Sequence, residues 1–392
     1  MSGGAPPRGK IIVFGLVFWY PLAGVMYQFL HYLNGLRKIG WDVYYVEDSA
    51  RPIYHIDAGS YTYDYEGTGN IAALGPVLDA HGYAGRWAFH DQHAGRCHGM
   101  PLGELRRLYR EADVLLNVSG GQEILEEHGR IPLKIYIETD PVKTEILVAQ
   151  GDQGMIDALD AHDAHFTFGE NFGAPDCGVP VERYRWLPTR QPVDLELWPW
   201  DETPGTAYTT VATWNNQGND IEWQGEVYGW SKRPEFLKIQ ELPRRRPQCE
   251  FEIAASMPDD DRTRFGQSGW KLTDPIAVSR DAESYRRYIR RSRGEFTVAK
   301  DQNVRLRSGW FSDRSCCYLA AGRPVINHDT AFGNALPTGR GLFSFRSLED
   351  ILAAVDAIES DYGAQRRAAR EIAAEYFAAE KVLESLCTRT GL

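Results

Sequence analysis

The chain has 392 residues, of which 43 are basic and 54 acidic, so its formal net charge is -11. A chain of this length is expected to form two domains, because a single hydrophobic core stops growing at a smaller size. The acidic balance argues against a nucleic-acid partner, since such a partner is usually met by a basic surface.

The first elements lie in an uncharged run at residues 11–30. The run follows Arg8 and Lys10, as a signal peptide or a membrane span might. Its pattern instead predicts a strand, IIVFGLVFW, and then an amphipathic helix, because apolar residues recur at helical spacing from Leu22 to Leu36. We therefore expect no stable membrane insertion.

Strands and helices continue to alternate through the first half. Gly40 ends the helix, and WDVYYVED predicts the second strand. Further strands are expected at 86–89, 113–118, 134–138 and near His165 and Arg185, with helices at 70–81 and 102–111. This alternation predicts a parallel sheet with helices on both faces. A Pro- and Trp-rich stretch at 197–205 marks the end of a first domain at about residue 200.

The second half repeats the alternation. Strands are expected at 207–214, 249–256, 276–278, 295–299 and 323–327, and helices at 233–242, 281–291, 313–321 and 347–360. The fold class is therefore α/β, with two Rossmann-like doubly wound domains at residues 1–200 and 201–375.

Metal and redox motifs are missing from the sequence. None of the six cysteines stands in a C-x-x-C or C-x-x-H pair, so reduced thiols and a cytoplasmic location are expected. The histidines of HDQHAGRCH, residues 90–98, do not have zinc-ligand spacing. The three aspartates at 259–261 follow a strand and a proline and are interpreted as a solvated turn. We expect no metal ion and no bound cofactor.

The most informative segment is SGWFSDRSCCYLAAGRPVINHDTAFG, residues 308–333. A loop with Ser308 and Gly309 precedes Ser312 and Asp313, which can begin a helix whose free N–H groups face an anion. Arg314 lies in the first turn, where a cation opposes the helix dipole. It therefore either serves a ligand or pairs with a carboxylate. The segment predicts a cradle for a diphosphate.

The run YLAAGRPVI, followed by LPTGRGLFSFRSLEDILAAV, resembles the donor-binding domain of GT-B glycosyltransferases. The resemblance implies two domains facing a cleft, with the acceptor held by the first and a UDP- or TDP-linked sugar by the second. It also implies that residues 376–392 form a helix crossing back to the first domain. Many retaining members carry two glutamates before the Gly-x-Pro-Val turn, and Gly309 and Cys317 stand at those positions here.

Further donor-site residues follow from position. Thr213 and Trp214 come just after the first strand of the second half, where open α/β sheets bind ligands, and the Trp214 ring can stack on a base. Lys232 precedes the next helix, and lysines near this position contact phosphate in similar enzymes. Packing for Trp214 and a solvated surface for Lys232 remain open alternatives.

Proton transfer from an acceptor hydroxyl needs a base. Asp140 and His90 follow strands of the first domain and are the favoured catalytic residues, with helix caps or loop carboxylates as the alternative. The aromatic segment YHIDAGSYTYDY, residues 54–65, suggests a pocket for a flat or apolar small molecule such as a natural product.

The sequence therefore predicts metal-independent transfer of a hexose-type sugar to a hydroxyl of a small-molecule or glycan acceptor. Two alternatives stay open. One is a nucleotide-sugar epimerase on the same fold, and the other is a catalytically silent binding partner, which the missing glutamate pair favours. An NAD-dependent dehydrogenase is disfavoured, because no G-x-G-x-x-G follows a strand.

Overall fold

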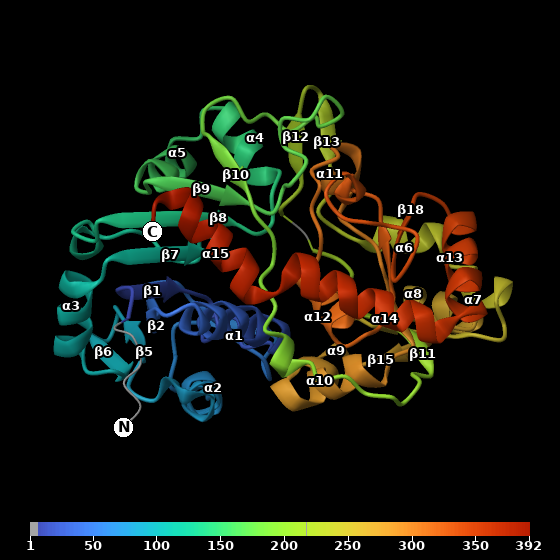
Figure 1. The fold of residues 1–392 in the computed structure, drawn as a ribbon, viewed down its shortest axis with the longest axis horizontal. Helices are drawn as coiled ribbons and strands as arrows, with labels where there is room; N and C mark the ends of the chain where they lie inside the picture. Colours follow the sequence, from blue (N-terminus) through green and yellow to red (C-terminus); the bar gives the residue numbers. More distant parts are fainter. Residues whose placement is uncertain (1–6, 217) are drawn as a thin grey trace.

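The computed structural model describes residues 7–216 and 218–392, which form two sheets lying side by side (Figure 1). The first sheet has the strand order β10-β9-β8-β7-β1-β2-β5-β6, and the second has the order β15-β14-β11-β16-β17-β18. Neighbouring strands are parallel, apart from the edge strand β6, which runs antiparallel to β5. The predicted α/β class with two Rossmann-like domains is confirmed.

The first sheet is built from residues 10–188. Its strands are β1 Lys10–Phe14, β2 Asp42–Ser49, β5 Trp87–Asp91, β6 Arg96–Gly99, β7 Val114–Val118, β8 Leu133–Glu138, β9 Ala164–Thr167 and β10 Trp186–Pro188. The accompanying helices are α1 Ala23–Lys38, α2 Asn70–Leu78, α3 Leu102–Glu111, α4 Lys143–Ala149 and α5 Gln153–Asp160. Strand β7 is buried along its whole length, as expected where helices cover both faces of a parallel sheet.

The second sheet is built from residues 207–345. Its strands are β11 Ala207–Val211, β14 Glu250–Ala254, β15 Lys271–Thr273, β16 Gly294–Thr297, β17 Val325–His328 and β18 Leu342–Phe345. The helices are α6 Arg233–Lys238, α7 Leu242–Arg245, α8 Asp259–Gln267, α9 Pro275–Ser279, α10 Ala282–Arg291, α11 Asp301–Arg305, α12 Asp313–Ala320, α13 Leu348–Ser360, α14 Tyr362–Ile372 and α15 Ala379–Thr390.

Two local predictions are wrong. Residues 276–278 belong to the helix α9 and not to a strand, because Pro275 occupies the first turn and the Asp274 carboxylate caps the N–H of Ile276. The expected turn at residues 259–261 is the first turn of α8. There Asp261 is buried and accepts hydrogen bonds from the Trp214 indole and the Arg233 guanidinium.

Two short hairpins stand apart from the main sheets. Strands β3 Ile53–His55 and β4 Ser60–Thr62 form one, within the first half, and β12 Ile221–Trp223 and β13 Glu226–Tyr228 form the other. The second hairpin packs against α4 of the first domain. It therefore connects the two domains directly.

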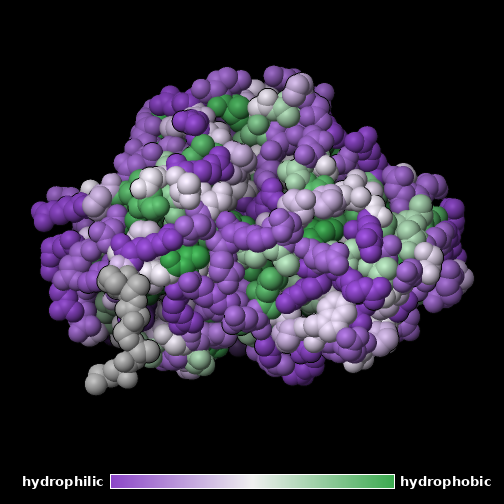
Figure 2. All heavy atoms as spheres, in the orientation of Figure 1, coloured by the Kyte–Doolittle hydropathy of each residue, from purple (hydrophilic) through white to green (hydrophobic). Residues whose placement is uncertain are grey.

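The C-terminal helices α14 and α15 extend across both domains in Figure 1. Helix α15 lies against α1 so closely that a Cβ on Gly35 would come within 2.7 Å of Ala379 and 2.6 Å of Leu383. Across the described residues, no helix is both long and apolar enough to cross a membrane. The face drawn in Figure 2 is mostly hydrophilic, and its hydrophobic atoms form small separate groups.

Candidate functional site

Charged side chains gather where residues following β8, β11 and β16 meet between the domains. We call this group the charged seam, and it consists of Asp140, Lys143, Lys232, Glu295, Lys300, Asp313 and Arg314. Lys300, from the second domain, donates a hydrogen bond to Asp140 of the first. Ligands of open α/β sheets bind at the carboxyl ends of the strands, so the seam has the position of a ligand site.

Lys232 is a seam cation without a partner. It precedes α6 and is only 9% exposed, yet its ammonium makes no hydrogen bond or ion pair with any residue that the structure describes. Its Nζ atom lies 5.8 Å from the ring centre of Trp310. Burial, with Arg314 and Lys300 nearby, lowers the pKa of Lys232 to about 7. A buried, unpaired cation is costly, so this position is suited to an anion.

Arg314, by contrast, is fully occupied by protein acceptors. Its Nε donates to Glu295 Oε1 at 2.5 Å, and its two terminal nitrogens donate to the Val211 carbonyl at 2.5 Å and the Thr297 hydroxyl at 2.6 Å. Glu295 is completely buried. Of the two alternatives left open by the sequence, the structure shows the carboxylate pair, and Arg314 joins α12 to β11 and β16.

The predicted loop at Ser308 and Gly309 forms a contact between the domains. Gly309 has φ +81°, and a Cβ there would lie 2.4 Å from the Asn171 backbone nitrogen of the first domain. The Ser308 hydroxyl donates to the Asn303 side chain at 2.7 Å. These two residues therefore hold the domains together instead of facing an open cradle.

Ser312 and Asp313 begin α12 beside the seam. Ser312 has the N-cap position but makes no side-chain capping bond. Asp313 is partly buried, and desolvation of its carboxyl group, with the Asp140 charge nearby, raises its pKa to about 7. The Oδ1 atom of Asp140 is also buried without a hydrogen-bond partner. The start of α12 thus adds an ionisable carboxyl group to the seam.

Thr213 and Trp214 differ in their exposure to solvent. Thr213 is exposed, whereas Trp214 is 1% exposed and stacks on Phe236 with ring centres 5.0 Å apart. Its indole nitrogen is hydrogen-bonded to Asp261. The Trp214 ring is therefore part of the second core and has no free face for a nucleotide base.

Sequence reasoning missed Lys300. The Lys300 ammonium lies 3.2 Å from the ring centre of Trp230, and Lys143 approaches the same ring at 5.9 Å. Lys300 comes just after β16, so the strand-end rule that led to Thr213 would also have found it.

The backbone between β8 and α4 is strained beside the seam. Val142 has φ +104°, which is rare for a β-branched residue, and is fully buried. Its N–H donates to Glu145 Oε2 at 2.6 Å. Strain of this kind is found preferentially at functional sites, and here it lies two residues after Asp140.

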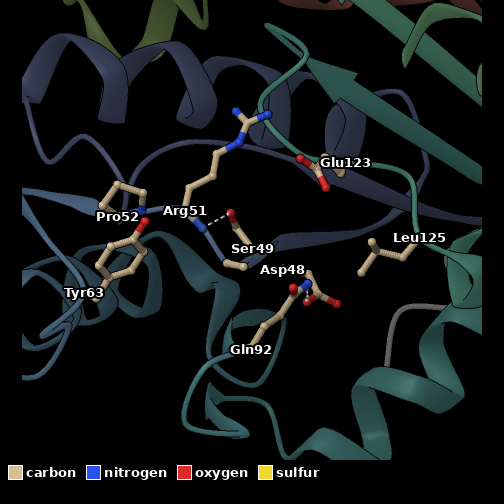
Figure 3. A pocket seen from close by; sticks show the side chains of 9 residues that line it. Asp48, Ser49, Arg51, Pro52, Tyr63, Gln92, Glu123 and Leu125 are labelled. Atoms are coloured by element: carbon tan, nitrogen blue, oxygen red, sulfur yellow. Dashed lines mark hydrogen bonds between the residues drawn. The ribbon is translucent and has the colours of Figure 1, made fainter. Parts of the chain in front are cut away.

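A separate pocket of about 220 Å³ opens at the carboxyl ends of β2 and β5 (Figure 3). Figure 3 shows Arg51 and Glu123 on one side of it, Asp48 and Gln92 on the opposite side, and Tyr63 at one end. The lining combines hydrogen-bonding side chains with the apolar surfaces of Pro52 and Leu125. The aromatic segment predicted to bind a flat ligand therefore contributes Tyr63 to a pocket with many hydrogen-bonding groups.

The predicted base His90 lies next to this pocket. Its Nδ1 is 2.8 Å from Asp48 Oδ1, which also accepts from Gln92, while Asp48 Oδ2 accepts from Tyr109 at 2.7 Å. Burial alone raises the pKa of Asp48, but hydrogen bonds from His128, His90, Gln92 and Tyr109 outweigh it and hold that pKa well below its usual value. The bond to Asp48 raises the pKa of His90.

His90 and Asp140 are not brought together. Strands β5 and β8 are separated by β2, β1 and β7, and four interstrand spacings amount to about 19 Å. The two residues therefore cannot act on the same proton.

Asp48, Glu127 and His128 place possible ligand atoms within 4.8 Å of one another. The Nδ1 atom of His128, however, accepts the backbone N–H of Leu125 at 3.0 Å, so the ring proton is on Nε2, the atom that faces Asp48. A metal ligand needs that nitrogen unprotonated. The arrangement fits a hydrogen-bond network and not a metal centre.

No protein-family model matches the sequence, and no curated protein is significantly similar to it. Solved structures, in contrast, are similar over nearly the whole chain. An α-glucosyltransferase in complex with UDP and a DNA 13-mer containing an HMU base has a TM-score of 0.59 at 11% identity, covering 98% of this chain and 99% of that one.

Two more solved structures are similar over nearly the whole chain at low sequence identity. HepE from Anabaena, in complex with UDP and glucose, has a TM-score of 0.54 at 12% identity and covers 98% of this chain and 100% of its own. AviGT4, a glycosyltransferase involved in avilamycin A biosynthesis, has a TM-score of 0.54 at 10% identity, with 97% of both chains covered. The two facing Rossmann-like domains and these similarities over full length show that the chain has the GT-B glycosyltransferase fold.

Proposed function

We propose that this protein transfers a sugar from a nucleoside-diphosphate donor to an acceptor hydroxyl, with the donor diphosphate bound at the charged seam. The observation that carries the proposal is Lys232, a buried ammonium with no partner among the described residues. A diphosphate would supply the missing negative charge. Charge-assisted hydrogen bonds of this kind are among the strongest in proteins.

The cations around Lys232 suit the leaving group of such a transfer. Lys300 and Lys143, one from each domain, both approach the Trp230 ring, and Lys300 lies near Lys232. Fixed positive charges that face a leaving diphosphate stabilise the charge that develops as the sugar bond breaks. On this basis we propose metal-independent transfer of a hexose from a UDP- or TDP-linked donor.

The domain roles follow from the position of the seam. Residues 201–375 would hold the donor, and residues 1–200 would hold the acceptor with its reacting hydroxyl near Asp140. The packing of α15 on α1 supports a return of residues 376–392 to the first domain. We propose a glycan or a hydroxyl-bearing small molecule as the acceptor. The absence of a nucleic-acid partner and a cytoplasmic location remain predictions from composition.

Asp140 is the proposed proton acceptor. It belongs to the seam, and its Oδ1 atom is buried without a partner while Oδ2 is held by Lys300. His90 belongs to the Asp48 network instead, about 19 Å from Asp140 across the sheet, so we do not assign it to the same proton transfer.

The test is calorimetric titration of UDP, TDP, GDP and ADP into the wild-type protein, Lys232→Ala and Lys271→Ala. Lys271 is an exposed control in the same domain. We expect one nucleotide to bind the wild type, and the loss of one charge-assisted bond in Lys232→Ala to weaken it by about tenfold to a hundredfold. Lys271→Ala should bind as the wild type does. If Lys232→Ala also bound unchanged, the seam would not be the donor site.

A catalytically silent binding protein is the second candidate, and one observation favours it. Many retaining GT-B enzymes carry glutamates at two positions where this chain has Gly309 and Cys317. Both residues contact the first domain here. Gly309 packs on Asn171, and the Cys317 sulfur lies 3.7 Å from His31 Nε2 on α1. Release of nucleoside diphosphate from a bound donor would rule this candidate out. Conversion of the donor sugar without an acceptor would identify an epimerase instead.

A further inference from the structure

A second pocket, of about 520 Å³, lies at the junction of the two domains, next to α4. Its walls come from α4, from the chain that enters β10 and from the β12–β13 hairpin, which Figure 1 shows together at the top of the molecule. Small-ligand sites usually have a volume in this range, and they are common at domain interfaces. The pocket beside Asp48 is less than half as large.

Two indole rings line this pocket, one from each domain. Trp186 lies on β10 and Trp223 on β12, and both are partly exposed. Trp186 meets Tyr136 and His165 edge-on, at interplanar angles of 66° and 69°. Neither indole is stacked on another aromatic ring within the part of the chain that the structure describes. Both rings are partly exposed and line the pocket, so a ligand can reach them.

Tyr184, the third aromatic residue of the pocket, differs from the two indoles. The Arg183 guanidinium lies 5.6 Å from its ring centre, and its hydroxyl donates to Asp160 at 2.7 Å. The ring face and the polar end of Tyr184 are therefore already engaged. Stacking in this pocket depends on Trp186 and Trp223.

A buried carboxyl group completes the lining. Glu145 is 1% exposed, and its Oε2 accepts the Val142 N–H while its Oε1 has no hydrogen-bond partner. Burial, together with the Glu138 charge, raises the pKa of Glu145 well above its usual value. An unpaired polar atom in such a place is costly, which suits a ligand that brings its own hydrogen-bonding groups. Glu182 and Arg183 add exposed charges at the rim.

The pocket is held in shape by contacts between the domains. Gln150 on α4 donates to the Glu222 carbonyl at 2.6 Å, and Lys143 donates to the Asn219 side chain at 2.7 Å. Beneath these bonds, Ile146 and Ile221 belong to one apolar cluster shared by α4 and the hairpin. A preformed site loses little conformational entropy when a ligand binds.

Aromatic faces combined with a few hydrogen-bonding groups suit a ligand that has both C–H faces and hydroxyl groups. We propose that this pocket binds a neutral oligosaccharide, with one sugar ring against Trp186 and Trp223 and a hydroxyl hydrogen-bonded to Glu145. The site lies apart from the charged seam and requires no nucleotide, so it goes beyond the proposed transfer reaction.

The experiment is calorimetric titration with maltotriose, cellotriose and chitotriose, without nucleotide. We expect saturable binding of one trisaccharide, weakened about tenfold in both Trp186→Ala and Trp223→Ala by the loss of stacking. Tyr61→Ala is the control, because Tyr61 is an exposed aromatic residue of another hairpin. Lys232→Ala should bind the trisaccharide unchanged, which separates this site from the donor site.

Trp186 also packs inside the protein, so a second pair of variants guards against misfolding. Trp186→Phe keeps a ring and should retain part of the affinity, and Glu145→Gln keeps an acceptor for the Val142 N–H while changing the group offered to the sugar. Binding of none of the three trisaccharides to the wild type would overturn the proposal. Equal affinity in the wild type, Trp186→Ala and Trp223→Ala would also overturn it, as would binding of the apolar probe anilinonaphthalene sulfonate alone.

Discussion

Two helices of the second domain each begin beside a largely buried cation, but one cation is paired with protein acceptors and the other is not. At the start of α12, Arg314 donates to a carboxylate, a carbonyl and a hydroxyl, and its charge is matched by buried Glu295. At the start of α6, Lys232 is only 9% exposed and has no partner in the described chain. The first cation stabilises the contact between α12 and its sheet, and the second costs stability until an anion arrives.

The same contrast separates the two ionisable networks of the molecule. The Asp48 carboxylate of the first domain has donors on both oxygens, which hold its pKa low in spite of burial. In the seam, the carboxyl of Asp313 has a pKa raised to about 7, and an oxygen of Asp140 is unpaired. A satisfied network stabilises the protein by itself, whereas an unsatisfied one indicates a place for a ligand.

The largest expected change in stability comes from removing the paired cation, Arg314. Arg314→Ala leaves the Glu295 charge buried without a partner, so the free energy of unfolding should fall by about 3–5 kcal/mol. Unfolding in denaturant measures this loss of free energy. Arg246→Ala is the matched control, since Arg246 pairs with Asp356 near the surface, where such a pair contributes about 1 kcal/mol or less. Equal losses in the two variants would contradict the assigned role of Arg314.

An effect of opposite sign is expected at the unpaired cation. Lys232→Met removes a buried, unpaired charge and keeps most of the side-chain volume, so the ligand-free protein should become more stable by about 1–3 kcal/mol. The same substitution should weaken nucleotide binding by about tenfold to a hundredfold, as in Lys232→Ala. Thermal unfolding with and without UDP measures both effects. A loss of stability without ligand would show that Lys232 has a partner in solution.

The smallest effect is the pH dependence of nucleotide binding. Lys232 has a folded-state pKa of about 7, lowered from 10.5, so it loses its proton in the free protein as the pH rises above 7. Binding an anion needs the charged form, and affinity for UDP should therefore fall by up to about tenfold per pH unit above neutrality. Calorimetry above about pH 7 avoids the second phosphate ionisation near pH 6.

Asp313 ionises over the same range and acts in the same direction, because its carboxylate repels the diphosphate. Asp313→Asn should therefore keep a smaller slope that comes from Lys232, while Lys232→Met should keep only the part that comes from Asp313. Among the remaining seam charges, Arg314 is paired with Glu295 and Lys300 with Asp140, while Lys143 donates to the Asn219 side chain. An affinity independent of pH in the wild type would exclude both groups from contact with the nucleotide.

The sequence predicted the long elements well and the short ones poorly. Helix α3 has the expected bounds, because its apolar spacing and its flanking residues agree. The expected strand at 276–278 is a helix, since an Asp cap and a proline outweigh β-branched composition over so short a stretch. Neither the β12–β13 hairpin nor the β3–β4 hairpin was expected, although each contributes to a pocket.

The site residues show the same limit. The resemblance to similar enzymes led to Lys232 and strand-end reasoning led to Asp140, and the fold brings both to one seam. Strand-end reasoning also led to His90, which lies about 19 Å away across the sheet. It also led to Trp214, whose indole completes a core. Position relative to a strand is local information, but whether a side chain faces the cleft or the core depends on the elements packed around it.

The sequence by itself determined the alternation of elements, and with it two parallel sheets, because hydrophobic periodicity and helix caps depend on neighbouring residues. The tertiary structure decided which charges are paired. Lys300 and Asp140 are 160 residues apart, and Arg314 finds its acceptors on two strands. Pairing and burial depend on such distant contacts. These two properties decide whether a cation stabilises the fold or is available to bind an anionic ligand.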